Sequence, residues 1–141
     1  MKAYQHILLA MDFSEISKRA AKRAVLLAGY FNSRLTIVHV LETHGALPEP
    51  MEQDTHAVKQ HQDQFERFFK EINISGAMPI IHVTSDSAKD VIVRVAEEIK
   101  ADLIVIGSAG VNDARRALSA TAEGVLRGAR CEVLVVRSLN K

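Results

Sequence analysis

Cysteines and long apolar runs are scarce in this sequence. Its 141 residues include one cysteine, Cys131, which has no partner for a disulfide within the chain. No apolar run approaches the about 18 residues that a membrane-spanning helix needs. The N-terminal run His6–Met11 stops at Asp12, which is too early for the core of a signal peptide. These absences argue against a disulfide-stapled or membrane-embedded domain, and we expect a soluble protein of the reducing cytoplasm.

An excess of one charge is also missing. The chain carries 18 Lys and Arg against 17 Asp and Glu, and each half is nearly neutral. Proteins that bind nucleic acid or anionic membranes use clustered Lys and Arg, so neither partner is expected. A length of 141 residues suits a single domain, 1–141, that is large enough to have its own core.

Short apolar runs alternate with helix-like stretches along the chain. The runs are apolar at nearly every position, as in strands buried on both faces of a parallel sheet. Between them, apolar residues recur every three or four positions, which is typical of helices that pack one stripe on a sheet. This alternation predicts an α/β fold with an open, doubly wound, five-stranded parallel sheet and helices on both faces. The predicted strands are His6–Met11, Leu35–Leu41, Pro79–Val83, Leu103–Ile106 and Val133–Val136.

Two helix starts and one long connection are also predicted. Ser14 is the expected N-cap of the first helix, and Ser87 with Asp90 three positions later resembles a capping box for the third. Residues 42–56 hold two of the three prolines and follow no period, so we expect a surface loop there.

Ligands of open α/β sheets bind beyond the carboxyl ends of the strands. Three predicted strands end in candidate residues: Asp12, then His39 with Val40, then Gly107 and Gly110. A glycine pair directly after a strand lets backbone N–H groups approach a phosphate, although many such turns hold two glycines for steric reasons alone. The segment lacks the residues that define a Walker A loop, a dinucleotide fingerprint or a nucleophile elbow.

A longer pattern surrounds the glycine pair. The segment reads GSAG, then VNDARRALS, then Ala120 and Thr121 at the start of the last predicted helix. With HILLAMDFSE near the start, IVHV, AEEIKADLIVIGSAG and CEVLVVR near the end, it resembles the universal stress protein family over nearly the whole chain. The resemblance implies a Rossmann-like fold of the adenine nucleotide alpha hydrolase type with strand order 3-2-1-4-5. It also implies ATP, with Mg²⁺ as its companion ion, as the ligand.

The resemblance assigns roles to individual residues. It implies that Asp12 meets adenine or ribose and that Val40 packs on adenine. Arg115 and Arg116 lie in the nine-residue spacer of the motif, where either is a candidate phosphate contact; the alternative is a solvated charged face. The resemblance places Gly107, Gly110 and Thr121 around the phosphates. Ser108 and Ala120, in the same motif, are further candidate nucleotide-binding residues.

One position departs from the family pattern. The third glycine of the motif is Ala120 here, so the sequence reads G-x2-G-x9-A-T. If the site requires a positive φ at this residue, alanine costs about 1 kcal/mol or more; if it requires close phosphate approach, the methyl group clashes. Thr121 still offers a hydroxyl group at a helix start, where free N–H groups favour an anion.

Several of the candidate residues also have a purely structural interpretation. Asp12 is also suited to be a helix-entry residue whose carboxylate accepts from N–H groups of the first turn. His39 and His82, on neighbouring strands, make a conceivable metal pair, but no further ligand is spaced to complete the site, so we interpret both as core histidines. The other candidates interpreted as core residues are Phe65, Phe68, Phe69 and Cys131.

We therefore expect a stress-response protein that binds ATP or a related adenine nucleotide at the ends of strands 1, 2 and 4, as a switch. No residue identifies itself as a base or metal cradle for phosphoryl transfer, so at most slow hydrolysis is expected. The alternative is a dimeric interaction protein of the same fold that binds no nucleotide. An adenylate-handling enzyme would need a substrate pocket for which 141 residues leave little room. The last strand lies at a sheet edge, where the resemblance implies a homodimer through Val133, Leu134, Val135 and Val136.

Overall fold

Strands and helices alternate in the computed structural model. It describes residues 3–42, 55–71, 78–84, 86–109 and 118–137, with the backbone alone for residues 42, 55–58, 61 and 78–84. The elements are β1 (His6–Ala10), α1 (Glu15–Phe31), β2 (Arg34–Glu42), α2 (Thr55–Glu71), β3 (Met78–Thr84), α3 (Ala88–Glu98), β4 (Leu103–Gly107), α4 (Ala120–Gly128) and β5 (Glu132–Val136).

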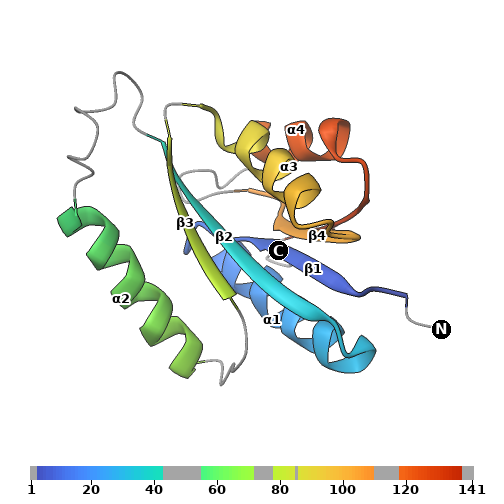
Figure 1. Cartoon of the computed structure of the whole chain (residues 1–141), viewed down its shortest axis with the longest axis horizontal. Helices are drawn as coiled ribbons and strands as arrows, with labels where there is room; N and C mark the ends of the chain where they lie inside the picture. The colour runs from blue at the N-terminus through green and yellow to red at the C-terminus, as the bar shows by residue number, and fades with distance from the viewer. Residues whose placement is uncertain (1–2, 43–54, 72–77, 85, 110–117, 138–141) are drawn as a thin grey trace.

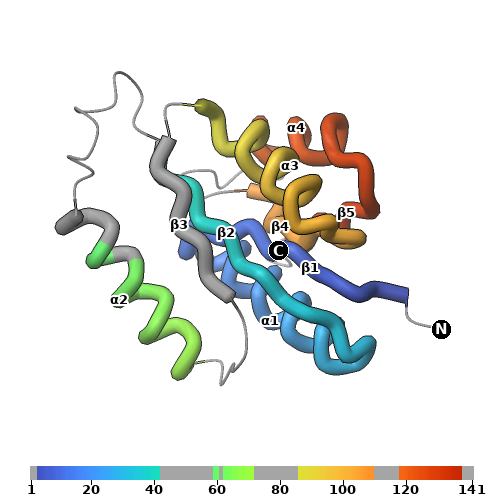
Figure 2. The backbone as a smooth tube through the Cα atoms, viewed as in Figure 1, coloured from blue at the N-terminus to red at the C-terminus, as the bar shows by residue number. Residues whose placement is uncertain are grey.

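The strands form one parallel sheet with the order β3-β2-β1-β4-β5. Strand β1 lies between β2 and β4 (Figure 2). All five of its residues are buried. The predicted α/β fold with a parallel sheet is confirmed. Strand β5 pairs with β4 along its whole length and lies at the end of this order, so its other edge meets no strand in the described part of the chain.

Two helices cover each face of the sheet (Figure 1). Successive side chains of a strand point to opposite faces, so Ile7 and Leu9 pack with α1 and α2, whereas Leu8 and Ala10 pack with α3 and α4. The apolar runs that predicted the strands thus supply two cores at once. This arrangement brings the first turns of α1, α3 and α4 to the edge of the sheet at which the strands end.

The predicted element ends are wrong at several positions. Strand β2 includes the charged residues Arg34 and Glu42, because the backbone ladder continues beyond the apolar run that marked the strand. Residues 42–56 were expected to form a loop, but Glu42 ends β2, and Thr55 and His56 begin α2. Residues 43–54 lie outside the described residues.

Helix starts are partly as predicted. Ser14 caps α1, and its hydroxyl oxygen accepts the N–H of Ser17 at 3.1 Å, which confirms that prediction. The predicted capping box of α3 is wrong in its geometry. Ser87 is the N-cap residue, but its hydroxyl group donates to the carboxylate of Asp90 at 2.8 Å and accepts no hydrogen bond from a backbone N–H of the first turn.

The predicted core residues differ in their burial. Phe65 and Phe68 are buried and Phe69 packs against the same core, as expected. Cys131 was expected to be buried but is half-buried, and this partial burial raises the pKa of its thiol above the ordinary value. Cys131 stands just before β5, which is the last strand in the described order of the sheet.

Candidate functional site

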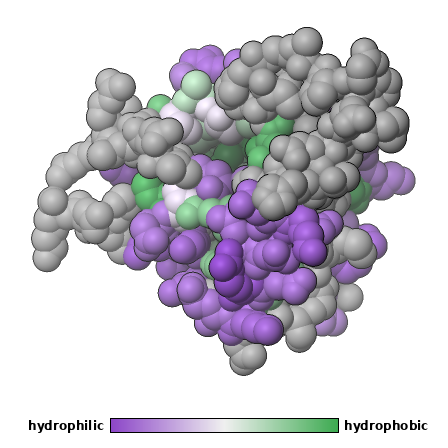
Figure 3. Space-filling model, turned by 90° about the vertical axis from the view of Figure 1, so that its left-hand side faces the viewer, coloured by the Kyte–Doolittle hydropathy of each residue, from purple (hydrophilic) through white to green (hydrophobic). Residues whose placement is uncertain are grey.

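A cavity of about 210 Å³ lies beyond the carboxyl ends of β1, β2 and β4. Figure 3 faces the side of the molecule at which the strands end and shows apolar surface in a hollow between hydrophilic side chains. One part of the cavity wall is apolar and includes Val38, Val40, Ile92 and Ile106. The polar part is formed by Asp12, Ser17, Ser119 and Thr121. A mostly apolar cavity with a few convergent polar groups is typical of a small-molecule site.

The structure brings four of the predicted site residues together. Asp12, Val40, Gly107 and Thr121 line the cavity although up to 109 positions separate them in the sequence. Ser108 is buried and is absent from the cavity lining. Ala120 is exposed and is also absent from that lining. The predicted residues that lie outside the described part of the chain are Gly110, Arg115 and Arg116.

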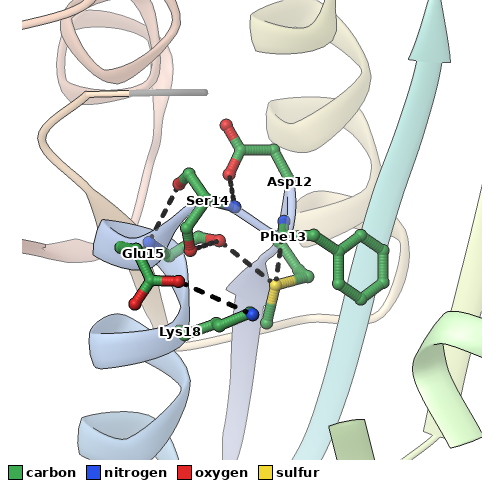
Figure 4. A network of polar contacts seen from close by, with 7 residues as sticks. Asp12, Phe13, Ser14, Glu15 and Lys18 are labelled. Atoms are coloured by element: carbon green, nitrogen blue, oxygen red, sulfur yellow. Dashed lines mark hydrogen bonds and ion pairs between the residues drawn. The ribbon is translucent and has the colours of Figure 1, made fainter. Parts of the chain in front are cut away.

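Asp12 lies in the turn between β1 and α1. Its Oδ1 accepts the N–H of Ser14 at 2.9 Å, so it does support the entry into α1. Figure 4 shows the second carboxylate oxygen pointing away from this turn. The helix-entry interpretation of Asp12 is therefore confirmed, and Asp12 also lines the cavity, where its contact with a ligand stays a prediction.

Gly107 is needed for the packing of α1 on β4. A Cβ atom at this position would lie 2.7 Å from Cγ2 of Ile16 and 3.3 Å from its backbone carbonyl carbon. The missing side chain lets the first turn of α1 approach the end of β4, so that Ser17 joins Gly107 in the cavity wall. This steric role is the plainer of the two explanations that the sequence left open for the glycine.

The start of α4 forms another part of the wall. Ser119 is its N-cap, and its hydroxyl oxygen accepts the N–H of Ala122 at 3.1 Å. Ala120 is the first helical residue and is not among the described non-glycine residues with positive φ, so alanine brings no backbone strain there. Thr121, one position further, lines the cavity as expected from the sequence.

First turns of three helices thus converge on one cavity. Ser17 comes from α1, Ala88 and Ile92 from α3, and Thr121 from α4. A helix start carries free N–H groups and the positive end of the helix dipole, and both favour an anionic group. The cavity combines this electrostatic preference with an apolar wall.

The two histidines considered as a metal pair lie on β2 and β3. His39 is buried, and its Nδ1–H donates to the carbonyl oxygen of Met11 at 2.8 Å, which confirms a core histidine. The side chain of His82 lies outside the described residues. Within the described ranges, no three His, Cys, Asp or Glu side chains are grouped to bind a metal ion. None of the described helices is long and apolar enough to cross a membrane.

The sequence and the fold have clear relatives. A model of the universal stress protein family matches residues 3–137. The chain belongs to the universal stress protein family. A family relative from Staphylococcus aureus (strain USA300) is 32% identical over 144 aligned positions, which cover 98% of this chain and 87% of the relative.

Solved structures share the fold. The protein MJ0577 has a TM-score of 0.81 and 26% identity, with 98% of this chain and 99% of that chain covered. A universal stress protein solved in complex with cAMP has a TM-score of 0.71 and 24% identity, with 96% and 98% covered. The family predicted from the sequence is confirmed by the family model and by the relative from Staphylococcus aureus.

Several residues of the cavity wall escaped sequence reasoning. Ser17, Ala88 and Ile92 carry no motif, and only the packing of α1 and α3 shows that they face the cavity. Ser119 did have a local signal, since a serine directly before an apolar helical stretch favours an N-cap.

Proposed function

We propose that this universal stress protein binds an adenine nucleotide in the cavity at the ends of β1, β2 and β4, with ATP as the physiological ligand and binding as a switch. The observation that carries the proposal is the meeting of Asp12, Val40, Gly107 and Thr121 around one cavity. A family member with the same fold was solved in complex with cAMP, which supports an adenine nucleotide as the ligand class.

The two parts of the cavity wall suit the two ends of a nucleotide. Val38, Val40 and Ile92 offer an apolar surface for a planar base, and Asp12 offers an acceptor for a base N–H or a ribose hydroxyl. A volume of about 210 Å³ is below the about 300–1,000 Å³ of sites that enclose a whole drug-sized ligand. We infer that the cavity holds the nucleoside and that the phosphates extend along the start of α4, beside Thr121.

Binding is proposed here in preference to turnover. Asp12 is the one carboxylate on the described wall, and it already accepts an N–H of its own turn. That makes it a weak choice for a base that activates water. Because Asp12 is assigned to the base or ribose, Mg²⁺ would enter with the nucleotide phosphates and be coordinated mainly by them and by water.

The test is the binding of ATP, ADP and AMP to the purified protein, each with and without Mg²⁺. A ligand at one hundred times its dissociation constant adds about 2.7 kcal/mol to the unfolding free energy, which a thermal shift resolves. Asp12→Asn keeps an acceptor for the Ser14 N–H but removes the charge, so we expect weaker binding with an almost unchanged unfolding midpoint. Glu98→Gln, an exposed carboxylate at the far end of α3, is the matched control. No shift with any nucleotide at millimolar concentration contradicts the proposal.

A homodimer through β5 is the second part of the proposal. Val133, Leu134, Val135 and Val136 are half-buried on an edge strand whose outer side pairs with no described strand. Exposed apolar edges of this kind favour pairing with a second copy. Light scattering should give twice the 15.6 kDa chain mass, and Val135→Glu should lower it to that of one chain. A single-chain mass for the unaltered protein at all concentrations refutes the dimer.

A further inference from the structure

Phe13 adopts a backbone conformation that needs an explanation. Its φ is 62°, in the left-handed region that disfavours every residue with a Cβ atom. The other described non-glycine residues with positive φ are Asn32 and Lys100, which follow the ends of α1 and α3. Left-handed residues are common there because they end helices. Phe13 instead precedes a helix, so helix termination does not explain it.

Short contacts fix the turn around Phe13 from several sides. The N–H of Phe13 donates to the sulfur of Met11 at 3.3 Å, and the N–H of Ser14 donates to Asp12 Oδ1 at 2.9 Å. Figure 4 shows these two bonds. The ring of His39 donates from Nδ1 to the carbonyl oxygen of Met11 at 2.8 Å. Together the three bonds hold the turn between β1 and α1 in one conformation.

The ring of Phe13 is held by aromatic residues that belong to other elements. Its centroid lies 5.1 Å from that of Phe65 and 6.4 Å from that of Phe68, both on α2, and 5.0 Å from that of His39 on β2. All three pairs have the edge-to-face geometry that aromatic rings prefer. Figure 4 shows the ring pointing toward β2, away from the Asp12 carboxylate.

None of these aromatic side chains lines the cavity, whereas the neighbouring Asp12 does. We propose that Phe13 is a positioning residue: its ring, packed against α2, holds the strained turn that directs Asp12 into the cavity. Helix α2 then controls the affinity of a site whose described lining includes none of its residues. The inference rests on the proposed nucleotide site, and it adds α2 as the element that regulates that site.

The packing of Phe13 on α2 and the binding of nucleotide affect each other. A change that loosens the packing of Phe13 on α2 lowers the population of the binding turn, and the apparent affinity falls by the same factor. By linkage, a bound nucleotide tightens the packing of α2. Removal of one aromatic pair changes the equilibrium constant between the binding turn and other turn conformations by a factor of about three to ten.

The first experiment compares two substitutions on α2 by calorimetric titration with ATP. Phe65→Leu removes a ring that contacts Phe13, and we expect the affinity to fall about three- to tenfold. Phe69→Leu is the matched control, since Phe69 contacts Phe65 and Phe68 but makes no ring contact with Phe13 in the described structure. Its affinity should stay within twofold of the unaltered protein. Phe13→Tyr, which keeps the ring, should also retain the affinity.

The second experiment needs no ligand. Amide hydrogen exchange reports the opening of the Ser14 N–H, which is held by the Asp12 carboxylate. In Phe65→Leu and in Phe13→Gly, exchange at Ser14 should be about three- to tenfold faster relative to the core amide of Leu8. In Phe69→Leu this ratio should be unchanged. Phe13→Gly tolerates the positive φ but lacks the ring, so it separates backbone strain from ring packing.

The outcomes separate the two proposals. If the unaltered protein binds no nucleotide but Ser14 exchange follows the ring contacts, the proposed function fails and the positioning role stands. If ATP binds and Phe65→Leu leaves its affinity unchanged, the positioning role is refuted. The positioning role is also refuted if Phe65→Leu and Phe69→Leu have equal effects on the affinity, or on the exchange rate of Ser14 relative to that of Leu8.

Discussion

The substitution Gly107→Ala tests the steric reason for the glycine at the end of β4. The added methyl group would lie 2.7 Å from Cγ2 of Ile16. Ordinary contacts between carbon atoms are about 3.5–4.0 Å, so the two groups must separate by about 1 Å. A second contact of 3.3 Å involves the backbone of Ile16, which means that a rotation of the Ile16 side chain does not relieve the clash completely. The first turn of α1 has to move.

Overpacking of a well-packed core costs about 1–3 kcal/mol, against a total unfolding free energy of about 5–15 kcal/mol for a domain of ordinary stability. In a chain of this length the thermal midpoint should fall by about 3–10 °C. The chain has no tryptophan, so urea unfolding followed by far-ultraviolet circular dichroism is the suitable assay. The slope of the transition should stay the same, because the surface exposed on unfolding does not change.

Gly29→Ala is the matched control. Gly29 lies within α1, its φ is not positive, and an added Cβ would meet nothing within 4 Å. Alanine should therefore raise the unfolding free energy by about 0.5–1 kcal/mol through helix propensity. If Gly107→Ala is as stable as the unaltered protein while Gly29→Ala gains stability as expected, the steric explanation of Gly107 is wrong.

Two further predictions concern single polar groups. Burial, together with the Arg34 charge, lowers the pKa of His6, so the unfolded chain binds a proton more readily than the folded one. The unfolding free energy should fall as the pH drops below about 6.5. Urea titrations at a series of pH values measure this fall, and His6→Gln should make it smaller. If the unfolding free energy of His6→Gln depends on pH as steeply as that of the unaltered protein, the prediction is refuted. Ser119→Ala removes the acceptor of the Ala122 N–H and should cost about 1 kcal/mol in the same unfolding assay, whereas Ser119→Asp, which restores an acceptor, should recover most of it.

The parallel sheet was predictable because both of its faces are covered. Each strand that is buried on two faces must be apolar at consecutive positions, and that pattern is visible without any structure. The strand ends were less predictable, since the ladder extends over Arg34 and Glu42, whose charged side chains carry no strand signal. Hydrogen bonds between backbones set these ends.

The candidate site was predictable where a residue lies near the carboxyl end of a strand. Asp12 follows β1 by two positions, Val40 lies two positions before the end of β2, and Gly107 ends β4. The topology of a parallel sheet brings such ends to one edge. Ser17 and Ile92 were missed because the face that a helical residue presents depends on how the helix packs. Ser108 was included through its place in a motif, but it lies buried beside the cavity, where its N–H donates to the carbonyl oxygen of Val136.

Gly107 shows how a motif residue that lines a site can also serve it through packing. If the glycine only made room for a phosphate, Gly107→Ala would lower nucleotide affinity and leave stability unchanged. The approach of Ile16 requires instead that stability fall as well. The same approach brings Ser17 and the start of α1 to the cavity, so a displaced helix would also move Asp12, which precedes it. Loss of both stability and affinity in Gly107→Ala would therefore identify the packing of α1 on β4 as the step that builds the cavity.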